Sequence, residues 1–286
     1  MSSPLADADR GPIIPRTVVR NEWLRVAGAV AAVLLLGGTS RAAASDSDSD
    51  SERDVYELHL AVDIPVMVTG GGIGLARALY EDHLVRKSCP CDPSTINGLD
   101  RWAVHYHSNA ASLAADITVY GTMFVLPVVD ALDLGFKRPL LDDVVVYAEA
   151  LAVDTGLQNI VNFAVARPRP RAYAGDPAFV NGAEGYVSFY AGHVSTAFTA
   201  MSAAAFTLRR RYGARVWPWI AAVLVGGSVA VERVASGHHF PTDVVTAAVA
   251  GTAIGIAIPW AHARPSGAIS LAPAPGGRGL ALVGRF

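Results

Sequence analysis

Six apolar segments occupy most of the chain after residue 56, and they restrict its fold more than any other feature. They cover roughly residues 58–80, 112–134, 142–166, 190–208, 216–236 and 240–262. Such segments are typical of membrane-spanning helices, which need about 20 apolar residues each. Hydrophobic residues make up 52% of the chain and charged residues only 17%, whereas about 25% are charged in an average soluble domain. The sequence therefore predicts an all-α, six-helix bundle embedded in a membrane.

The third apolar segment differs from the others because polar residues interrupt it. Glu149, Asp154 and Gln158 all lie within this segment. An ionisable group inside a membrane span is costly unless it faces the interior of the bundle or water. We therefore expect these three side chains to face the interior of the bundle or water, away from lipid.

The chain begins with the features of an export signal. An apolar run from Val26 to Gly38 follows several arginines, and residues 42–44 are all alanine. A basic start, a short apolar run and small residues at its end are typical of a cleaved signal peptide. We expect residues 1–44 to be a signal peptide, and an uncleaved N-terminal anchor is the alternative.

The rest of the chain divides into three parts. Residues 45–55 form an acidic, serine-rich spacer, a composition that cannot pack into a core. Residues 56–263 contain the six apolar segments and should form the helical domain. Residues 264–286 form a tail rich in Gly and Pro, in which residues 269–272 and 279–286 are candidates for short strands.

Basic residues gather in two loops between the apolar segments. Lys137 and Arg138 lie between the second and third segments, and residues 209–211 and Arg215, all arginine, lie between the fourth and fifth. Because positively charged loops remain cytoplasmic, the loops after the third and fifth segments should face outside. An uncleaved anchor would reverse this assignment. We expect a bacterial-type cell membrane with the active site facing outside, and an exported periplasmic protein is the alternative.

Cys89 and Cys91 are the two cysteines of the chain. A C-x-C pair offers too few ligands for a zinc site, which uses four. The pair is therefore either incidental or, outside the cytoplasm, part of a disulfide within this chain or to another chain.

Three polar clusters lie on the loops that should face outside, at residues 162–171, 188–195 and 232–243. In the third cluster, His239 and Asp243 are four residues apart, so on a helix they would share one face. The carboxylate could then accept a hydrogen bond from Nδ1 of the imidazole and leave Nε2 free to attack. An ordinary polar pair at a helix start is the alternative.

The first two clusters carry groups that suit an anion. Arg167, Arg169 and Arg171 alternate with prolines, and guanidinium groups match phosphate oxygens. Taken singly, they also suit a basic cap at a membrane edge. Gly192 and His193 open the fourth segment, where the N–H groups of a helix start bind anions and the imidazole could act as a general acid.

Together, the three clusters resemble the signature of the type 2 phosphatidic acid phosphatase (PAP2) and vanadium haloperoxidase superfamily. That signature reads Lys-x6-Arg-Pro, then Pro-Ser-Gly-His, then Ser-Arg-x5-His-x3-Asp. The residues that match it are Arg169, Pro170, Gly192, His193, Arg233, His239 and Asp243. The resemblance extends over residues 56–263 and implies the all-α, six-helix bundle of this superfamily.

The resemblance also implies a role for each matching residue. His239 would be the nucleophile that forms a phosphohistidine, Asp243 would orient it, and His193 would protonate the leaving alcohol. The groups that would hold the phosphoryl oxygens are Arg169, Arg233 and the Gly192 amide. Such a site stabilises a charge-rich transition state without a metal cofactor.

Three signature positions are changed in this chain. Asn162 replaces the lysine, Ala191 with its preceding tyrosine replaces Pro-Ser, and Glu232 replaces the serine before the arginine. Asn162 can still donate a hydrogen bond to phosphate but brings no charge. If each lost donor is worth ~2.7–4 kcal/mol, the two losses would slow the reaction by several orders of magnitude. The arginines that could supply the missing charge are Arg167 and Arg171.

These features predict an enzyme that hydrolyses a phosphomonoester or pyrophosphate, and we expect its substrate to be a phosphorylated lipid of the membrane. The first alternative is a catalytically impaired relative with a binding or structural role. The second is a vanadate-dependent haloperoxidase or a soluble exported acid phosphatase, and only a haloperoxidase would need vanadate as a cofactor. The net charge of -2 offers no basic surface, so nucleic acid is not an expected partner.

Overall fold

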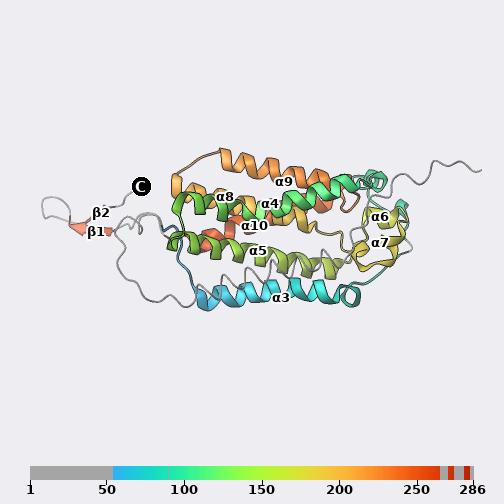
Figure 1. Cartoon of the computed structure of the whole chain (residues 1–286), viewed down its shortest axis with the longest axis horizontal. Coiled ribbons are helices and arrows are strands. Elements are labelled where there is room, and N and C mark those ends of the chain that lie inside the picture. The colour runs from blue at the N-terminus through green and yellow to red at the C-terminus, as the bar shows by residue number, and fades with distance from the viewer. Residues whose placement is uncertain (1–53, 90, 265–269, 274–279, 284–286) are drawn as a thin grey trace, which may run out of the picture. The chain divides into compact units, whose positions relative to one another are not determined.

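A computed structural model describes residues 54–89, 91–264, 270–273 and 280–283 of the chain. The predicted signal peptide or anchor at residues 1–44 and most of the acidic spacer at residues 45–55 lie outside the described residues. Six long helices dominate the described part (Figure 1). They are α3 (Leu60–Leu84), α4 (Asn109–Leu134), α5 (Arg138–Val165), α8 (Gly192–Tyr212), α9 (Trp217–Ala235) and α10 (Pro241–His262).

Each long helix coincides with one of the six predicted segments, so the all-α, six-helix bundle is confirmed. Local sequence sets several of the helix ends. Ser108 caps α4 by accepting a hydrogen bond from the amide of Ala111 at 3.1 Å, a common N-terminal cap. Proline lies in the first turn of α5, α9 and α10, where its missing N–H costs nothing.

Short helices and one hairpin complete the described part, and the short helices were not predicted. Their bounds are η1 (Pro93–Thr95), η2 (Arg101–His105), α6 (Pro170–Tyr173), α7 (Pro177–Asn181) and η3 (Ala183–Tyr186). The hairpin pairs β1 (Ser270–Pro273) with β2 (Leu280–Val283) in antiparallel register. The two short strands expected in the C-terminal tail are therefore present.

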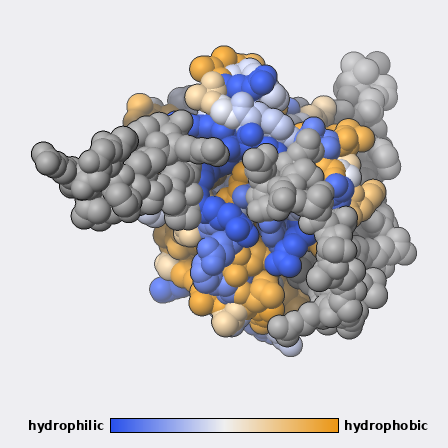
Figure 2. Space-filling view, turned by 90° about the vertical axis from the view of Figure 1, so that its left-hand side faces the viewer, coloured by the Kyte–Doolittle hydropathy of each residue, from blue (hydrophilic) through white to orange (hydrophobic). Residues whose placement is uncertain are grey.

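Successive long helices run in opposite directions, so the connecting segments gather at the two ends of the bundle (Figure 1). The segments α3–α4, α5–α8 and α9–α10 meet at one end, here called the site end. The α4–α5 and α8–α9 loops meet at the other end, here called the basic end, because they carry Lys137, Arg138 and Arg215. Figure 2 looks onto the basic end and shows hydrophilic surface framed by apolar side chains. The predicted separation of basic loops from the polar clusters is confirmed.

Helix α5 lies inside the bundle and packs against α3, α4, α8 and α10. Its three polar residues face inward as expected, because Glu149, Asp154 and Gln158 are all buried. Asp154 accepts hydrogen bonds from the hydroxyl groups of Ser195 and Thr196 on α8. The polar residues that interrupt this segment therefore serve helix–helix contacts and do not meet lipid.

The outer faces of the bundle are apolar. Val68 on α3, Leu224 on α9 and Val249 on α10 each expose 67% of their surface, and many other large apolar side chains are exposed on these helices and on α4. Among the described residues, five helices are long and apolar enough to cross a membrane, and they are α3, α4, α5, α9 and α10. An apolar exterior of this kind marks a membrane protein.

Helix α8 is the long helix that falls outside this group. It packs against α4, α5, α9 and α10, and most of its buried side chains are alanine, serine and threonine. Small residues allow helices to approach one another closely inside a membrane bundle. Because α8 is surrounded by other helices, it does not need the apolar surface that its neighbours present.

Candidate active site

The three polar clusters meet at the site end of the bundle. Backbone hydrogen bonds join the loops that carry them. The amide of Ser188 donates to the carbonyl of Arg167 at 3.0 Å, and the amide of Arg171 donates to the carbonyl of Gly237 at 3.2 Å. Gly237 has a φ of +69°, and a Cβ there would lie 2.1 Å from the carbonyl oxygen of Tyr106. The α9–α10 turn therefore requires glycine at this position.

His239 lies just before α10, with its side chain buried. Its Nδ1 atom is 2.7 Å from the carbonyl oxygen of Ser188. Because a carbonyl can only accept a hydrogen bond, Nδ1 carries the hydrogen and Nε2 keeps the lone pair. Burial, together with the positive charges of Arg169 and Arg233, lowers the pKa of His239 well below its usual value. The imidazole is therefore neutral at physiological pH, as a nucleophile must be.

The link from Asp243 to His239 is indirect, which differs from the expected direct hydrogen bond. The nearest approach between Asp243 Oδ2 and His239 Nδ1 is 4.0 Å. Asp243 accepts a hydrogen bond from the Ser188 hydroxyl at 2.5 Å and another from the amide of Phe240 at 2.9 Å. The physical reason is that α10 begins at Pro241, so His239 precedes the helix and the i,i+4 geometry does not apply. Ser188 is the partner that sequence reasoning missed.

Arg167 contacts two carboxylates that are both buried. Its Nη1 atom donates to Asp243, and its Nη2 atom donates to Asp100 at 2.8 Å. Its guanidinium also lies 4.2 Å from the ring centre of Phe240. Burial opposes ionisation of Asp100, but hydrogen bonds from Arg167 and Thr242 outweigh it and lower the pKa of Asp100. Arg167 therefore holds the α9–α10 turn in place. The sequence had indicated Arg167 as a candidate phosphate-binding residue.

Arg171 is also committed to the surrounding loops. Its Nε atom donates to the carbonyl of Ser236 at 3.0 Å, and its Nη2 atom donates to Asn109 Oδ1 at 2.8 Å. These contacts join the segment after α5 to the start of α4 and the end of α9. The guanidinium of Arg171, like that of Arg167, is therefore occupied by contacts within the protein.

Arg169 and Arg233 differ from these two arginines because they have spare donors. Both are buried, with 4% and 3% of their surface exposed. Arg169 pairs with Glu184 at 3.2 Å, and Arg233 pairs with Asp116 at 3.4 Å. Within the described residues, the buried Nε atoms of both have no hydrogen-bond partner. Since buried donors are costly when unpaired, this pair of cations suits an anionic ligand.

His193 lies in the first turn of α8, next to Gly192, the first residue of that helix. Its Nε2 atom is 2.9 Å from Oδ1 of Asp116 on α4, and the same oxygen is 3.4 Å from Nη1 of Arg233. Asp116 therefore connects the second cluster to the third. No motif indicated Asp116, because it lies near the start of an apolar segment, outside the three polar clusters. Its only signal in the sequence is an ionisable residue inside a predicted span.

Asn162, which stands at the lysine position, supports the loop that holds His239. Its Nδ2 atom donates to the carbonyls of Phe189 and Tyr190, at 2.8 and 3.1 Å. Its Oδ1 atom accepts a hydrogen bond from Nη1 of Arg77 at 3.2 Å. Arg77 lies on α3, so its guanidinium brings a positive charge next to the side chain of Asn162. Sequence reasoning missed this residue.

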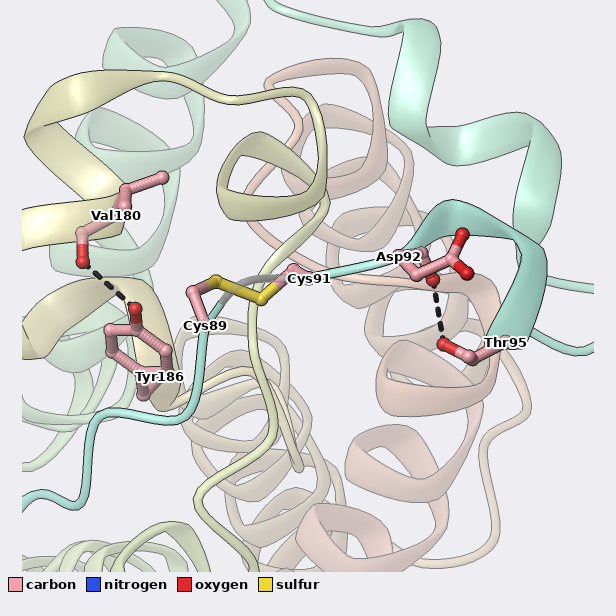
Figure 3. Close-up of a disulfide and its surroundings, with 6 residues drawn as sticks. All are labelled: Cys89, Cys91, Asp92, Thr95, Val180 and Tyr186. Carbon is pink, nitrogen blue, oxygen red and sulfur yellow. Dashed lines mark hydrogen bonds between the residues drawn. A yellow bond between two sulfur atoms is a disulfide. The ribbon is translucent and has the colours of Figure 1, made fainter.

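The segment α3–α4 covers the loop before α8 at the site end. Figure 3 shows Cys89 and Cys91 joined by a disulfide near the ring of Tyr186. Val85, Ala183, Tyr186 and Val187 form one buried apolar cluster with Cys89 packed against it. Of the alternatives for the two cysteines, a disulfide within the chain is the one observed.

Two buried arginines with spare donors, two imidazoles and a carboxylate lie at converging helix ends of an all-α membrane bundle, and such a set of groups suits an oxyanion. Residues 143–266 match the model of the PAP2 superfamily, a segment that runs from α5 through α10. Over these residues the chain is similar to the PAP2 superfamily, and the resemblance predicted from the three clusters is therefore confirmed.

The crystal structure of Aquifex aeolicus LpxE is similar at 21% sequence identity, over 61% of this chain and 98% of that chain, with a TM-score of 0.41. No curated protein matches the chain.

Proposed function

We propose that this protein is a membrane phosphatase that hydrolyses a phosphorylated lipid through a phosphohistidine intermediate. The observation that carries the proposal is the convergence of His239, His193, Arg169 and Arg233 at one end of the bundle. The neutral, buried imidazole of His239 suits a nucleophile, and the two arginines suit the charge of a phosphoryl group. A site at the end of lipid-facing helices suits a substrate whose tail stays in the membrane.

In the proposed first step, Nε2 of His239 attacks phosphorus, and the P–N bond forms as the bond to the leaving oxygen breaks. His193 gives its proton to that oxygen, so the product leaves as a neutral alcohol. Arg169, Arg233 and the amide of Gly192 hold the phosphoryl oxygens. In the second step, water attacks the phosphohistidine, His193 takes the proton, and inorganic phosphate leaves as the P–N bond breaks.

Asp116 and Asp243 act as positioning residues in this proposal. Nε2 of His193 lies 2.9 Å from the carboxylate of Asp116, which orients the ring that must deliver a proton in the first step. Asp243 orients the hydroxyl of Ser188, whose carbonyl fixes the tautomer of His239. We assign Arg167 to the same supporting group, because two carboxylates already occupy its guanidinium.

Arg77 supplies, in our proposal, the positive charge that Asn162 lacks. Its guanidinium is 2.8 Å from Asn159 Oδ1 and 3.2 Å from Asn162 Oδ1. Its Nη2 atom lies 3.5 Å from Glu81 Oε1, and 21% of the side chain stays exposed, so a ligand oxygen could reach the guanidinium. A cation contributed by α3 would offset the missing lysine, and it favours an active enzyme over a catalytically impaired relative.

We further propose that the site end faces the outside of the cell. Two independent observations support this orientation. The basic loops lie at the opposite end, and basic loops remain cytoplasmic. The Cys89–Cys91 disulfide lies on the site end, and disulfides persist in oxidising compartments outside the cytoplasm.

Phosphate release from phosphatidate or an isoprenyl diphosphate, in detergent and without added metal, tests the enzymatic proposal. The wild type should turn over at least one of these lipids, and His239→Ala should show no turnover. His83→Ala is the matched control, because it removes an exposed histidine at the same end of the bundle and should retain full activity. Wild-type turnover no greater than that of His239→Ala across both lipids would show that the protein is not this enzyme.

A further inference from the structure

A second cluster of ionisable groups lies at the basic end of the bundle, away from the candidate active site. It consists of Asp63 in the first turn of α3, Glu149 on α5 and His262, the last residue of α10. All three side chains are more than nine-tenths buried. The proposed phosphatase reaction uses none of them, and the three helices that carry them come from distant parts of the sequence.

The geometry of the cluster matches the first coordination shell of a metal ion. Nε2 of His262 is 3.3 Å from Asp63 Oδ1 and 3.2 Å from Glu149 Oε2, and the three ligand atoms all lie within 4.8 Å of one another. Nitrogen and oxygen ligands bind Zn²⁺ at about 2.0–2.2 Å, so neighbouring ligands of a tetrahedral site are about 3.3–3.6 Å apart. The two distances from His262 fall close to that range.

The second nitrogen of His262 is oriented as in a metal ligand. Its Nδ1 atom lies 2.9 Å from the carbonyl oxygen of Ile258, so Nδ1 carries the hydrogen and Nε2 faces the two carboxylates. Histidines that bind metals commonly donate their other ring N–H to a backbone carbonyl, which fixes the tautomer. This arrangement therefore presents a lone pair toward Asp63 and Glu149.

Charge and hydrogen bonding also indicate a missing cation. In the described part of the chain, the ion pairs of Asp63 and Glu149 are both with His262. Even a protonated imidazole offers one positive charge to two buried carboxylates, and an uncompensated buried charge is costly. Within the described residues, the buried Oε2 atom of Glu149 makes no hydrogen bond. A divalent cation would satisfy this oxygen and neutralise both carboxylates.

We propose that Asp63, Glu149 and His262 bind one divalent transition-metal ion, of which Zn²⁺ is the best match, and that the ion joins α3, α5 and α10. One nitrogen and two carboxylate oxygens suit such an ion and leave a position for water. We assign the ion a structural role, because it would lie where α3 and α5 pack closely. At Gly70 of α3, a Cβ would lie 2.1 Å from the carbonyl oxygen of Ala152 on α5. The ion would fix the start of α3 against this close contact.

Metal content of the full-length protein, purified in detergent with metal-free buffers, gives the first test. We expect about one zinc per chain after zinc loading and gel filtration, and a rise in Tm on adding Zn²⁺. Glu149→Gln and His262→Gln should lose the bound ion and the rise in Tm. Asp142→Asn is the matched control, because Asp142 is also a buried acid of α5 but lies outside the cluster, and it should retain both.

Co²⁺ provides a second measurement on the wild type itself, in case the variants fail to fold. A site with few ligands gives strong visible d–d absorption with Co²⁺, and Zn²⁺ should displace it. A wild type without retained zinc, Tm shift or Co²⁺ absorption would overturn the proposal, as would equal metal content in the wild type and Glu149→Gln. Neither measurement uses phosphatase activity, so failure of the proposed function would leave this test intact.

Discussion

The carbonyl oxygen of Ser188 lies 2.7 Å from Nδ1 of His239, so the loop before α8 orients an imidazole that precedes α10. The hydroxyl of the same serine donates to Asp243 at 2.5 Å. Ser188 thus stands between the carboxylate and the imidazole that the sequence had paired directly. The backbone carbonyl fixes the tautomer, whereas the hydroxyl connects that backbone to a carboxylate held by Arg167.

Removal of the Ser188 hydroxyl should weaken catalysis without abolishing it. Ser188→Ala keeps the carbonyl that holds His239 but leaves Asp243 without one donor. A hydrogen bond to a charged group is worth about 1.5–3 kcal/mol, so we expect kcat to fall about 10- to 100-fold. Ser228→Ala is the control, since within the described residues its hydroxyl donates to the backbone of its own helix. A Ser188→Ala variant with wild-type kcat would show that the link to Asp243 has no catalytic effect.

The proposed role of Arg77 can be tested by removing its charge and placing a lysine at position 162, where the PAP2 signature has one. Arg77→Ala should lower kcat/KM by about 10²–10³-fold, the effect of losing a donor to the transition state. Asn162→Lys should restore part of that loss in the double variant, because the lysine would place an ammonium group near the vacated guanidinium. Arg86→Ala removes an exposed arginine of the adjoining loop and should have little effect. If the double variant is no better than Arg77→Ala, the two positions do not share a role.

The role of His193 predicts a dependence on the leaving group. His193→Ala should reduce the hydrolysis of alkyl phosphates by about 10²–10⁴-fold, because an alkoxide needs a proton to leave. The same variant should lose much less activity with p-nitrophenyl phosphate, whose leaving group is stable as an anion. Asp116→Asn should show the same pattern to a smaller degree. Equal losses with both substrates would assign His193 to binding or folding.

The lowered pKa of His239 predicts how kcat changes as the pH falls. Protonated His239 cannot attack phosphorus, and burial with the charges of Arg169 and Arg233 moves its protonation to lower pH. We therefore expect kcat to stay level as the pH falls from about 7.5 to about 6, below the ordinary histidine pKa of about 6.5. Arg169→Gln removes one of these charges, so the residual activity of that variant should fall at a higher pH than the wild type. A wild-type midpoint near 6.5 would contradict this expectation.

Much of the fold could be predicted because it is local in the sequence. The six apolar segments set the six long helices, and prolines in the first turns of α5, α9 and α10 mark where those helices start. The inward orientation of Asp154 followed from the cost of a charge in lipid. The short helices α6 and α7 were not predicted, because segments of 4 and 5 residues are too short to show a helical period.

The sequence by itself determined which chemical groups the site contains, because each polar cluster has a fixed spacing within one loop. The tertiary structure alone decided which groups meet across loops. In the tertiary structure, Arg167 donates hydrogen bonds to Asp243 and Asp100. Arg77 contacts Asn162. Asp116 lies between His193 and Arg233. These contacts join residues from 67 to 117 positions apart. The period of a helix relates residues three or four positions apart, whereas contacts between helices depend on how the whole bundle packs.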